Sequence, residues 1–177
     1  MERRNFLSTA LLSIPVISFA NLNLDFPIIA NKSKKGFVIK ANESRYFGKT
    51  GVNPDFLSDC KISTSDSDNG LLIFNSNKNT FKEKGGPPLH VHSYENEIVF
   101  VISGNFEVHI EDKIHSLQTG DTAFIPKGTM HTISSPIDNN PGQIMCIFQP
   151  ASEKVEQFFE YVSRTGQVPL DKIPEGW

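Results

Sequence analysis

Short runs of apolar residues, separated by turn-forming residues, recur along most of the chain. In the clearest run, residues 106–110, every second residue from Phe106 to Ile110 is apolar. This period of two predicts a strand with one apolar and one polar face. His109 falls on the polar face, and we expect His115 beside it on the next strand, after a turn at residues 112–113. Both are interpreted as surface histidines.

Further runs of strand character are bounded by glycine, proline, asparagine or aspartate. They cover residues 37–41, 71–75, 97–102, 121–125, 131–134 and 143–149. Many short strands at close intervals are typical of a barrel or sandwich. The pattern therefore predicts an all-β fold.

One segment near the carboxyl end has helical spacing instead. Its apolar residues recur at i, i+3, i+4 and i+7: Val155, Phe158, Phe159 and Val162. Ser152 can cap this helix, and Gly166 followed by Pro169 can end it. We predict one helix and a tail within residues 151–177, with the apolar stripe packed on the outside of the barrel.

The first twenty residues have the composition of an export signal. Arg3 and Arg4 precede an apolar stretch that ends in a small-residue cleavage site at residues 18–20. The paired arginines before Asn-Phe-Leu resemble a twin-arginine signal. The stretch is shorter than the ~20 residues that span a bilayer, and Pro15 interrupts it, so a membrane anchor is not favoured.

We therefore expect cleavage after Ala20, a linker at residues 21–35, and a location in the periplasm or otherwise outside a bacterial cytoplasm. The remaining 157 of the 177 residues suit one domain. Their formal charge is −4, because the first twenty residues hold two of the 17 basic and one of the 20 acidic residues. No basic cluster remains, so we expect neither a nucleic-acid partner nor attachment to a membrane after cleavage.

The chain contains two cysteines, Cys60 and Cys146. An exported protein could bridge them. However, Cys146 lies in an apolar run, where a free thiol behaves as a small hydrophobic side chain. Nothing in the sequence brings the two backbones within the ~7 Å that a bridge requires, so free thiols are favoured.

Four residues carry the candidate chemistry: His90, His92, Glu97 and His131. His90 and His92 are two residues apart, so both imidazoles point to one face if the segment is extended. Three imidazoles and a carboxylate suit a divalent transition metal and, in octahedral geometry, leave positions open for a ligand. We predict one divalent ion, with iron, manganese and nickel expected first and zinc, copper and cobalt as alternatives.

The residues around these ligands form two blocks. The first is GGPPLHVHSYENEIVFVISG at residues 85–104, and the second runs from Gly120 through Pro126-Lys127-Gly128 to His131. Together they resemble the two signature motifs of the cupin superfamily, and the first block is similar to its quercetin dioxygenase-like branch. Two positions depart from the motifs: the opening glycine is Gly85 rather than position 84, and Ser135 stands where an asparagine is usual.

The resemblance implies a single-domain (type 2) cupin, in which residues 36–150 form a double-stranded β-helix, or jelly-roll barrel, followed by the helix. It also implies that Glu97, which fits the family spacing, is the carboxylate ligand. Glu95 does not fit that spacing and is interpreted as a solvated turn residue. A small-molecule substrate is implied, and a homodimer is compatible with the family.

The activity implied by the resemblance is that of a metal-dependent dioxygenase acting on a flavonol-like or other enolisable aromatic substrate. Glu97 would then be both a metal ligand and the general base that accepts the substrate's hydroxyl proton. The alternative is a non-oxidative cupin that binds or isomerises a sugar or a small organic acid.

Phenylalanine is abundant, with fourteen in the chain. Five fall in predicted strands: Phe74, Phe100, Phe106, Phe124 and Phe148. Such side chains either fill the barrel or form aromatic walls around the metal. For any single one, the core position is favoured.

Overall fold

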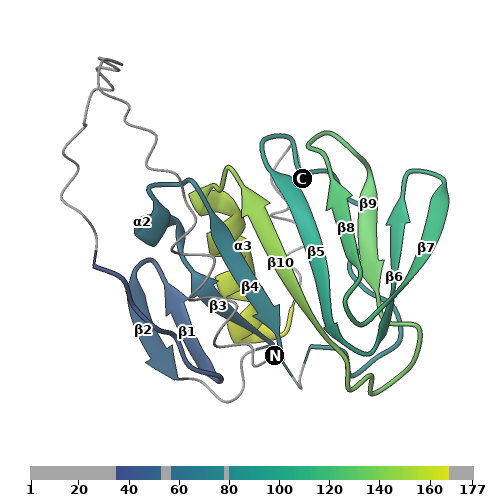
Figure 1. Cartoon of the computed structure of the whole chain (residues 1–177), viewed down its shortest axis with the longest axis horizontal. Coiled ribbons are helices and arrows are strands. Elements are labelled where there is room, and N and C mark those ends of the chain that lie inside the picture. The colour runs from purple at the N-terminus through teal and green to yellow at the C-terminus, as the bar shows by residue number, and fades with distance from the viewer. Residues whose placement is uncertain (1–34, 53–56, 78–79, 168–177) are drawn as a thin grey trace, which may run out of the picture. The chain divides into compact units, whose positions relative to one another are not determined.

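A computed structural model describes residues 35–52, 57–77 and 80–167, which belong to one compact unit beginning at Lys35. Their strands form three antiparallel sheets (Figure 1). The largest contains, in spatial order, β3 (Ser58–Ile62), β4 (Leu72–Ser76), β10 (Gln143–Gln149), β5 (Asn96–Ser103) and β8 (Thr122–Ile125). The second contains β7 (Lys113–Gln118), β6 (Asn105–Ile110) and β9 (His131–Ser134). A hairpin, β1 (Glu43–Tyr46) and β2 (Lys49–Val52), forms the third.

Two helices accompany the sheets, α2 (Thr64–Ser67) and α3 (Glu153–Thr165). The predicted capping of α3 is confirmed: the Ser152 side chain accepts a hydrogen bond from the amide of Val155, and Gly166 ends the helix in the left-handed conformation. The expected all-β architecture with a carboxy-terminal helix is likewise confirmed. No helix in the described part of the chain is both long and apolar enough to cross a membrane.

The five-stranded sheet buries one face against two hydrophobic clusters. The cluster shared with the smaller sheet consists of Phe81, Val99, Val101, Phe106, Val108, Ile125, Ile133 and Ile144. The cluster shared with α3 and the hairpin consists of Tyr46, Cys60, Leu72, Phe74, Phe148, Ala151 and Val155. The sheet is therefore covered partly by the smaller sheet and partly by α3.

This arrangement corrects the predicted position of the helix. The apolar stripe of α3 does not pack on the outside of the barrel but extends the core beside it. The ring of Phe159 lies 4.4 Å from that of Phe74 and 5.5 Å from that of Phe148, both on the buried face of the sheet. The physical reason is that the smaller sheet leaves β3 and β4 uncovered, and a helix with an apolar stripe fills that gap.

A buried carboxylate joins α3 to the rest of this cluster. Glu156 is fully buried and accepts hydrogen bonds from the backbone amides of Phe47 (2.7 Å) and Thr64 (2.9 Å) and from the Thr64 hydroxyl. Burial of a charge is costly unless hydrogen bonds compensate it. These bonds offset that cost and fix α3 to the β1–β2 turn and to α2.

The amino-terminal part of the unit was predicted least well. The predicted strand at residues 37–41 is wrong, because this segment has no regular structure. The hairpin that follows was not predicted. Its turn places Phe47 at φ 48° and Gly48 at φ 75°. A bulky residue at positive φ is rare, and Phe47 stands here where Asn or Asp is usual before the glycine of such a turn. The sequence therefore lacks the signal that predicts a hairpin.

Of the two predicted surface histidines, His109 lies on the predicted face of its strand, whereas His115 lies on the other face. His109 pairs with Ile114 across β6 and β7, whereas His115 pairs with Val108 and so lies on the opposite face. The predicted turn was one residue late, since it occupies Glu111 and Asp112. Any two-residue turn pairs odd-numbered residues of β6 with even-numbered residues of β7, so His109 and His115 could not share a face with the turn at either position. His115 is nevertheless exposed, because β7 is an edge strand.

The two cysteines are both free, as the sequence favoured. Each is the pairing partner of Phe74, Cys60 from β3 and Cys146 from β10. Two strand spacings, roughly 9–10 Å, therefore separate their backbones. That distance is too large for a disulfide.

Candidate metal centre

The centre is built on a backbone pairing between two of the predicted ligands. The amide of His90 donates to the carbonyl of His131 (3.0 Å), and the amide of His131 donates back to the carbonyl of His90 (2.9 Å). Gly85 and Ser135 exchange a second pair of hydrogen bonds, of 2.9 and 2.7 Å. The segment before β5 is thereby attached to β9, which brings histidines distant in sequence next to each other.

The glycines of the first motif make this approach possible. A Cβ atom at Gly86 would overlap the carbonyl oxygen of Ile133, so only glycine fits. Gly85 has a φ of +108°, which side chains rarely adopt. Gly85 and Ser135, the two departures from the usual cupin motifs, are thus partners in one bridge. The two departures therefore pair with each other through backbone hydrogen bonds, and neither residue belongs to the group of four candidate ligands.

All four predicted ligands come together. One donor atom from each of His90, His92, Glu97 and His131 can be chosen so that all lie within 4.8 Å of one another. Glu97 enters from β5, where it pairs with Phe148 of β10. His92, Glu97 and His131 are buried, and His90 is half-buried. His109 and His115 lie outside this group.

Backbone carbonyls set the orientation of two imidazoles. Nδ1 of His90 lies 2.8 Å from the carbonyl oxygen of Pro88, and Nδ1 of His131 lies 2.9 Å from that of Thr129. A carbonyl oxygen only accepts, so each Nδ1 carries a proton and each Nε2 is left for the centre. Each Nε2 is thereby directed toward the centre, where it can bind a metal when it carries no proton.

The carboxylate of Glu97 lies among these nitrogens. Its Oε2 is 2.8 Å from Nε2 of His131 and 3.3 Å from Nε2 of His92. Burial on its own would raise the pKa of Glu97, but hydrogen bonds from His131 and His92, together with their charge, lower it to about 2. The carboxylate therefore stays ionised at ordinary pH and remains available as an oxygen ligand.

The pKa values of His90 and His131 are shifted in opposite directions. Burial lowers the pKa of His90. Burial also works against protonation of His131, but the hydrogen bond and the charge of Glu97 outweigh it and raise the pKa of His131. Three imidazoles and one ionised carboxylate, converging in a buried site, are a donor set that fits a divalent transition metal.

Two residues that sequence patterns did not assign to the site lie against these ligands. The ring of Phe148 stands edge-on to that of His92, with 5.2 Å between centroids and 75° between planes. Cys146 interacts with Glu97, and burial together with the negative charge of Glu97 raises the pKa of its thiol. Both come from β10, and the apolar pattern of that strand does not show which strand it will pair with.

Glu95 corrects a further prediction. It is buried rather than solvated, although it does not belong to the group of four. The chain bends at Ser93 and Tyr94, and the burial pattern of residues 95–97, with Glu95 and Glu97 buried and Asn96 half-buried, already follows that of β5. Alternation then places Glu95 on the same face as Glu97, and that face is buried.

Comparison with known proteins agrees with this architecture. A cupin domain is matched over residues 79–148. Protein SchB of Streptomyces halstedii is 45% identical over 42 residues, which are 24% of this chain and 30% of that relative. The matched stretch therefore spans less than a third of its length.

Similar folds occur among solved structures. KdgF from Halomonas sp. is 20% identical with a TM-score of 0.52, over 69% of this chain and 99% of that one. An RmlC-like cupin from Shewanella frigidimarina is 19% identical with a TM-score of 0.49, over 69% and 96% of the two chains. Fold and site define a β-barrel protein with a three-histidine, one-carboxylate centre. A cupin domain is thus recognised within the chain, over residues 79–148.

We predict that Phe148→Leu weakens metal binding, because the lost ring edge leaves the imidazole of His92 free to turn. Residues behind metal ligands typically contribute a factor of roughly 10–100 in affinity. The matched control is Phe74→Leu, which removes an equally buried ring of the same cluster. Calorimetric titration of the metal-free proteins with Ni²⁺ measures both. Equal affinities of the two variants would show that Phe148 does not position His92.

Proposed function

We propose that this protein is a metal-dependent dioxygenase that acts on a flavonol-like or other enolisable aromatic substrate. The observation that supports this best is the convergence of three imidazoles and Glu97 within 4.8 Å, with His90 only half-buried. A divalent ion held there, with iron, manganese and nickel as first candidates, would supply a Lewis acid with open positions for substrate oxygens.

The chain's own residues have distinct tasks in this proposal. The Pro88 and Thr129 carbonyls hold the rings of His90 and His131, so that Nε2 of each faces the centre. Glu97 remains ionised and lies beside the position where a substrate hydroxyl would be held. A carboxylate at this place can accept the hydroxyl proton, which makes Glu97 the proposed general base.

The aromatic class of the substrate is supported by the motif rather than by the phenylalanines. Phe74, Phe106 and Phe148 are completely enclosed in the core. Phe100 and Phe124 are 37% and 59% exposed and alternate with residues of the buried face. Of the five, Phe148 contacts the ring of His92, but the set as a whole does not form aromatic walls around the centre. The proposal depends instead on the similarity of residues 85–104 to the quercetin dioxygenase-like branch.

One observation favours the second candidate, a non-oxidative cupin that binds or isomerises a sugar or a small organic acid. A carboxyl group with a pKa of about 2 is a weak base. It suits a residue that serves only as a ligand. In that case the centre would polarise a carbonyl or carboxylate without proton transfer to Glu97.

Oxygen consumption separates the two candidates. We expect the Fe²⁺-, Mn²⁺- or Ni²⁺-loaded protein to consume oxygen only when a flavonol, catechol or β-diketone is added. Glu97→Gln keeps an oxygen for the ion but cannot act as a base, so turnover should fall roughly 10²-fold with most metal retained. His109→Ala is the control and should match the native protein. No substrate-dependent uptake across this series, with binding of a sugar acid instead, would favour the non-oxidative cupin.

We also propose that residues 1–20, which lie outside the described residues, direct export of the folded protein. The support is the Arg3-Arg4-Asn5-Phe6-Leu7 sequence followed by an apolar stretch. Replacing both arginines by lysine should leave the precursor in the cytoplasm, as measured by cell fractionation. Unchanged recovery of the double variant in the periplasm would refute this signal.

A further inference from the structure

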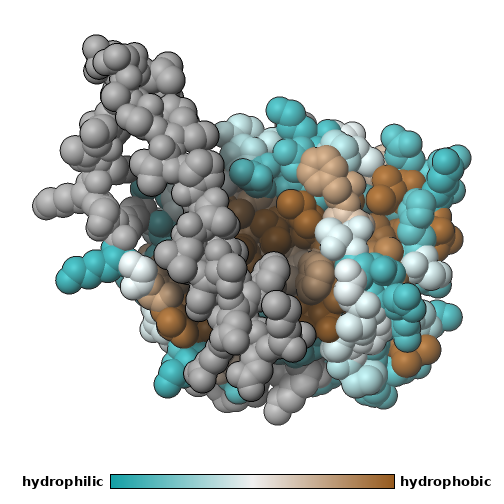
Figure 2. All heavy atoms as spheres, viewed as in Figure 1, coloured by the Kyte–Doolittle hydropathy of each residue, from teal (hydrophilic) through white to brown (hydrophobic). Residues whose placement is uncertain are grey.

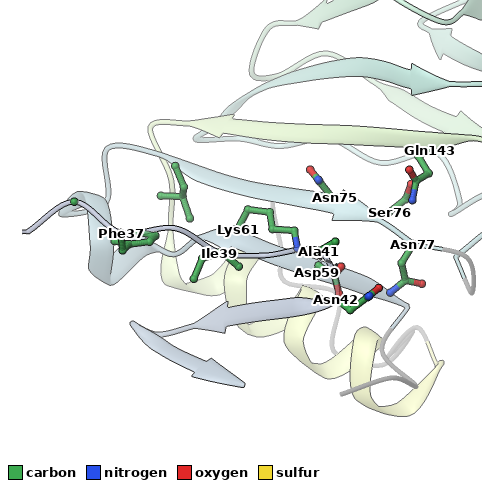
Figure 3. A pocket seen from close by; sticks show the side chains of 12 residues that line it. Phe37, Ile39, Ala41, Asn42, Asp59, Lys61, Asn75, Ser76, Asn77 and Gln143 are labelled. Atoms are coloured by element: carbon green, nitrogen blue, oxygen red, sulfur yellow. Dashed lines mark hydrogen bonds and ion pairs between the residues drawn. The ribbon is translucent and has the colours of Figure 1, made fainter. Parts of the chain in front are cut away.

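A second concave region lies away from the metal centre, on the face of β3 and β4 that α3 does not cover (Figure 3). Its volume is about 760 Å³, within the range of small-molecule sites. Phe74 points to the helix side of β4, so its neighbour Asn75 points to the other side, into this groove. None of the four residues of the metal centre lines it.

The groove combines polar side chains with the apolar side chains of Ile39, Ala41 and Ile62, and its charges balance. Asp59 lies directly opposite Asn75 in the β3–β4 pairing. The ammonium of Lys61 is 3.3 Å from the Asp59 carboxylate and also donates to the carbonyls of Lys40 (3.1 Å) and Glu43 (2.8 Å). One positive charge thus balances one negative charge, and the donors of Lys61 are used within the protein. The groove is therefore not a site for phosphate or another anion.

Asn75 has the feature that points to a ligand. Its side-chain oxygen is buried and has no hydrogen-bond partner among the described residues. An unpaired buried polar atom costs stability, and a leucine of similar shape would avoid that cost. A ligand that donates a hydrogen bond in the groove would satisfy this atom.

The rim supplies two further kinds of contact. Asn42 and Gln143 line one part of the groove with primary amides, a group that contains both donors and an acceptor. Phe37 lines the other part (Figure 3). The guanidinium carbon of Arg45 lies 4.3 Å from the centroid of the Phe37 ring, and Phe37 is 45% exposed. Amide groups and an aromatic side chain match the hydroxyl groups and the C–H surface of a sugar ring.

From the balanced charges, the unpaired Asn75 oxygen, the amide rim and Phe37, we propose that this groove binds a neutral mono- or oligosaccharide. An extended peptide fits less well, because added strands pair with an exposed sheet edge. Although β3 is an edge strand, this groove is lined by side chains on the face of β3 and β4 and not by the backbone of that edge. This inference goes beyond the proposed oxygenase function and does not depend on it.

Saturation-transfer NMR on the full-length protein with cellobiose, maltose and N,N′-diacetylchitobiose tests the proposal. At least one of these saccharides should bind the native protein, and the dissociation constant should rise tenfold or more in Asn75→Leu and in Gln143→Ala. Gln118→Ala, an exposed glutamine at the end of β7, is the matched control and should bind as the native protein does. The midpoint of thermal unfolding of Asn75→Leu should not fall below that of the native protein, since the variant removes an unpaired buried oxygen.

His92→Ala distinguishes the groove from the metal centre. Saccharide binding that persists in this variant supports the groove, and binding that disappears assigns the saccharide to the metal centre and overturns the proposal. Failure of all three saccharides to bind the native protein also overturns it. So does binding of a hexaglycine peptide, used as the neutral peptide probe, in their place.

Discussion

The pairing of His90 with His131 through two backbone hydrogen bonds is the constraint on which the centre depends. It joins the segment before β5 to β9, and these two parts of the chain supply all three imidazoles. The approach is close enough that Gly86 has no room for a side chain against Ile133. A cupin motif can therefore be understood as a steric requirement: glycines permit the approach, and the histidines beside them are then directed into one buried space.

The same approach explains the electrostatics of the centre. Glu97 is buried at the start of β5, where an isolated carboxylate would be costly. The imidazoles of His131 and His92 supply hydrogen bonds and charge that lower its pKa to about 2. The backbone carbonyls behind His90 and His131 keep Nε2 of each ring directed inward. The chain thus holds the four side chains of the candidate centre close to one another.

Sequence patterns predicted the four residues that the fold brings together, because strand alternation and motif spacing are local properties. They failed where geometry depended on one residue or on distant pairing. Phe47 at positive φ hid the first hairpin, and the pairing of β6 with β7 places His115 on the face opposite to His109. Phe148 reaches the site only because β10 inserts between β4 and β5, an order that no local pattern contains. Glu95 was misjudged because its burial depends on where the bend before β5 ends.

The five-stranded sheet uses its two faces differently. The inner face carries the metal centre and both hydrophobic clusters, whereas the other face carries the groove at β3 and β4. Apolar side chains also gather over β10 and β5 on the face seen in Figure 2. The groove and the candidate metal centre lie on opposite faces of one sheet and share no residue, so each could hold a ligand independently of the other.

Metal content is the most direct test of the central claim that these four residues form one centre. Elemental analysis of the purified native protein should give close to one divalent ion per chain. His92→Ala should lose most of that metal, because one of four ligands is removed, and His109→Ala should retain it. Equal metal content in the two variants, or a native protein that binds no divalent ion on titration, would contradict the account.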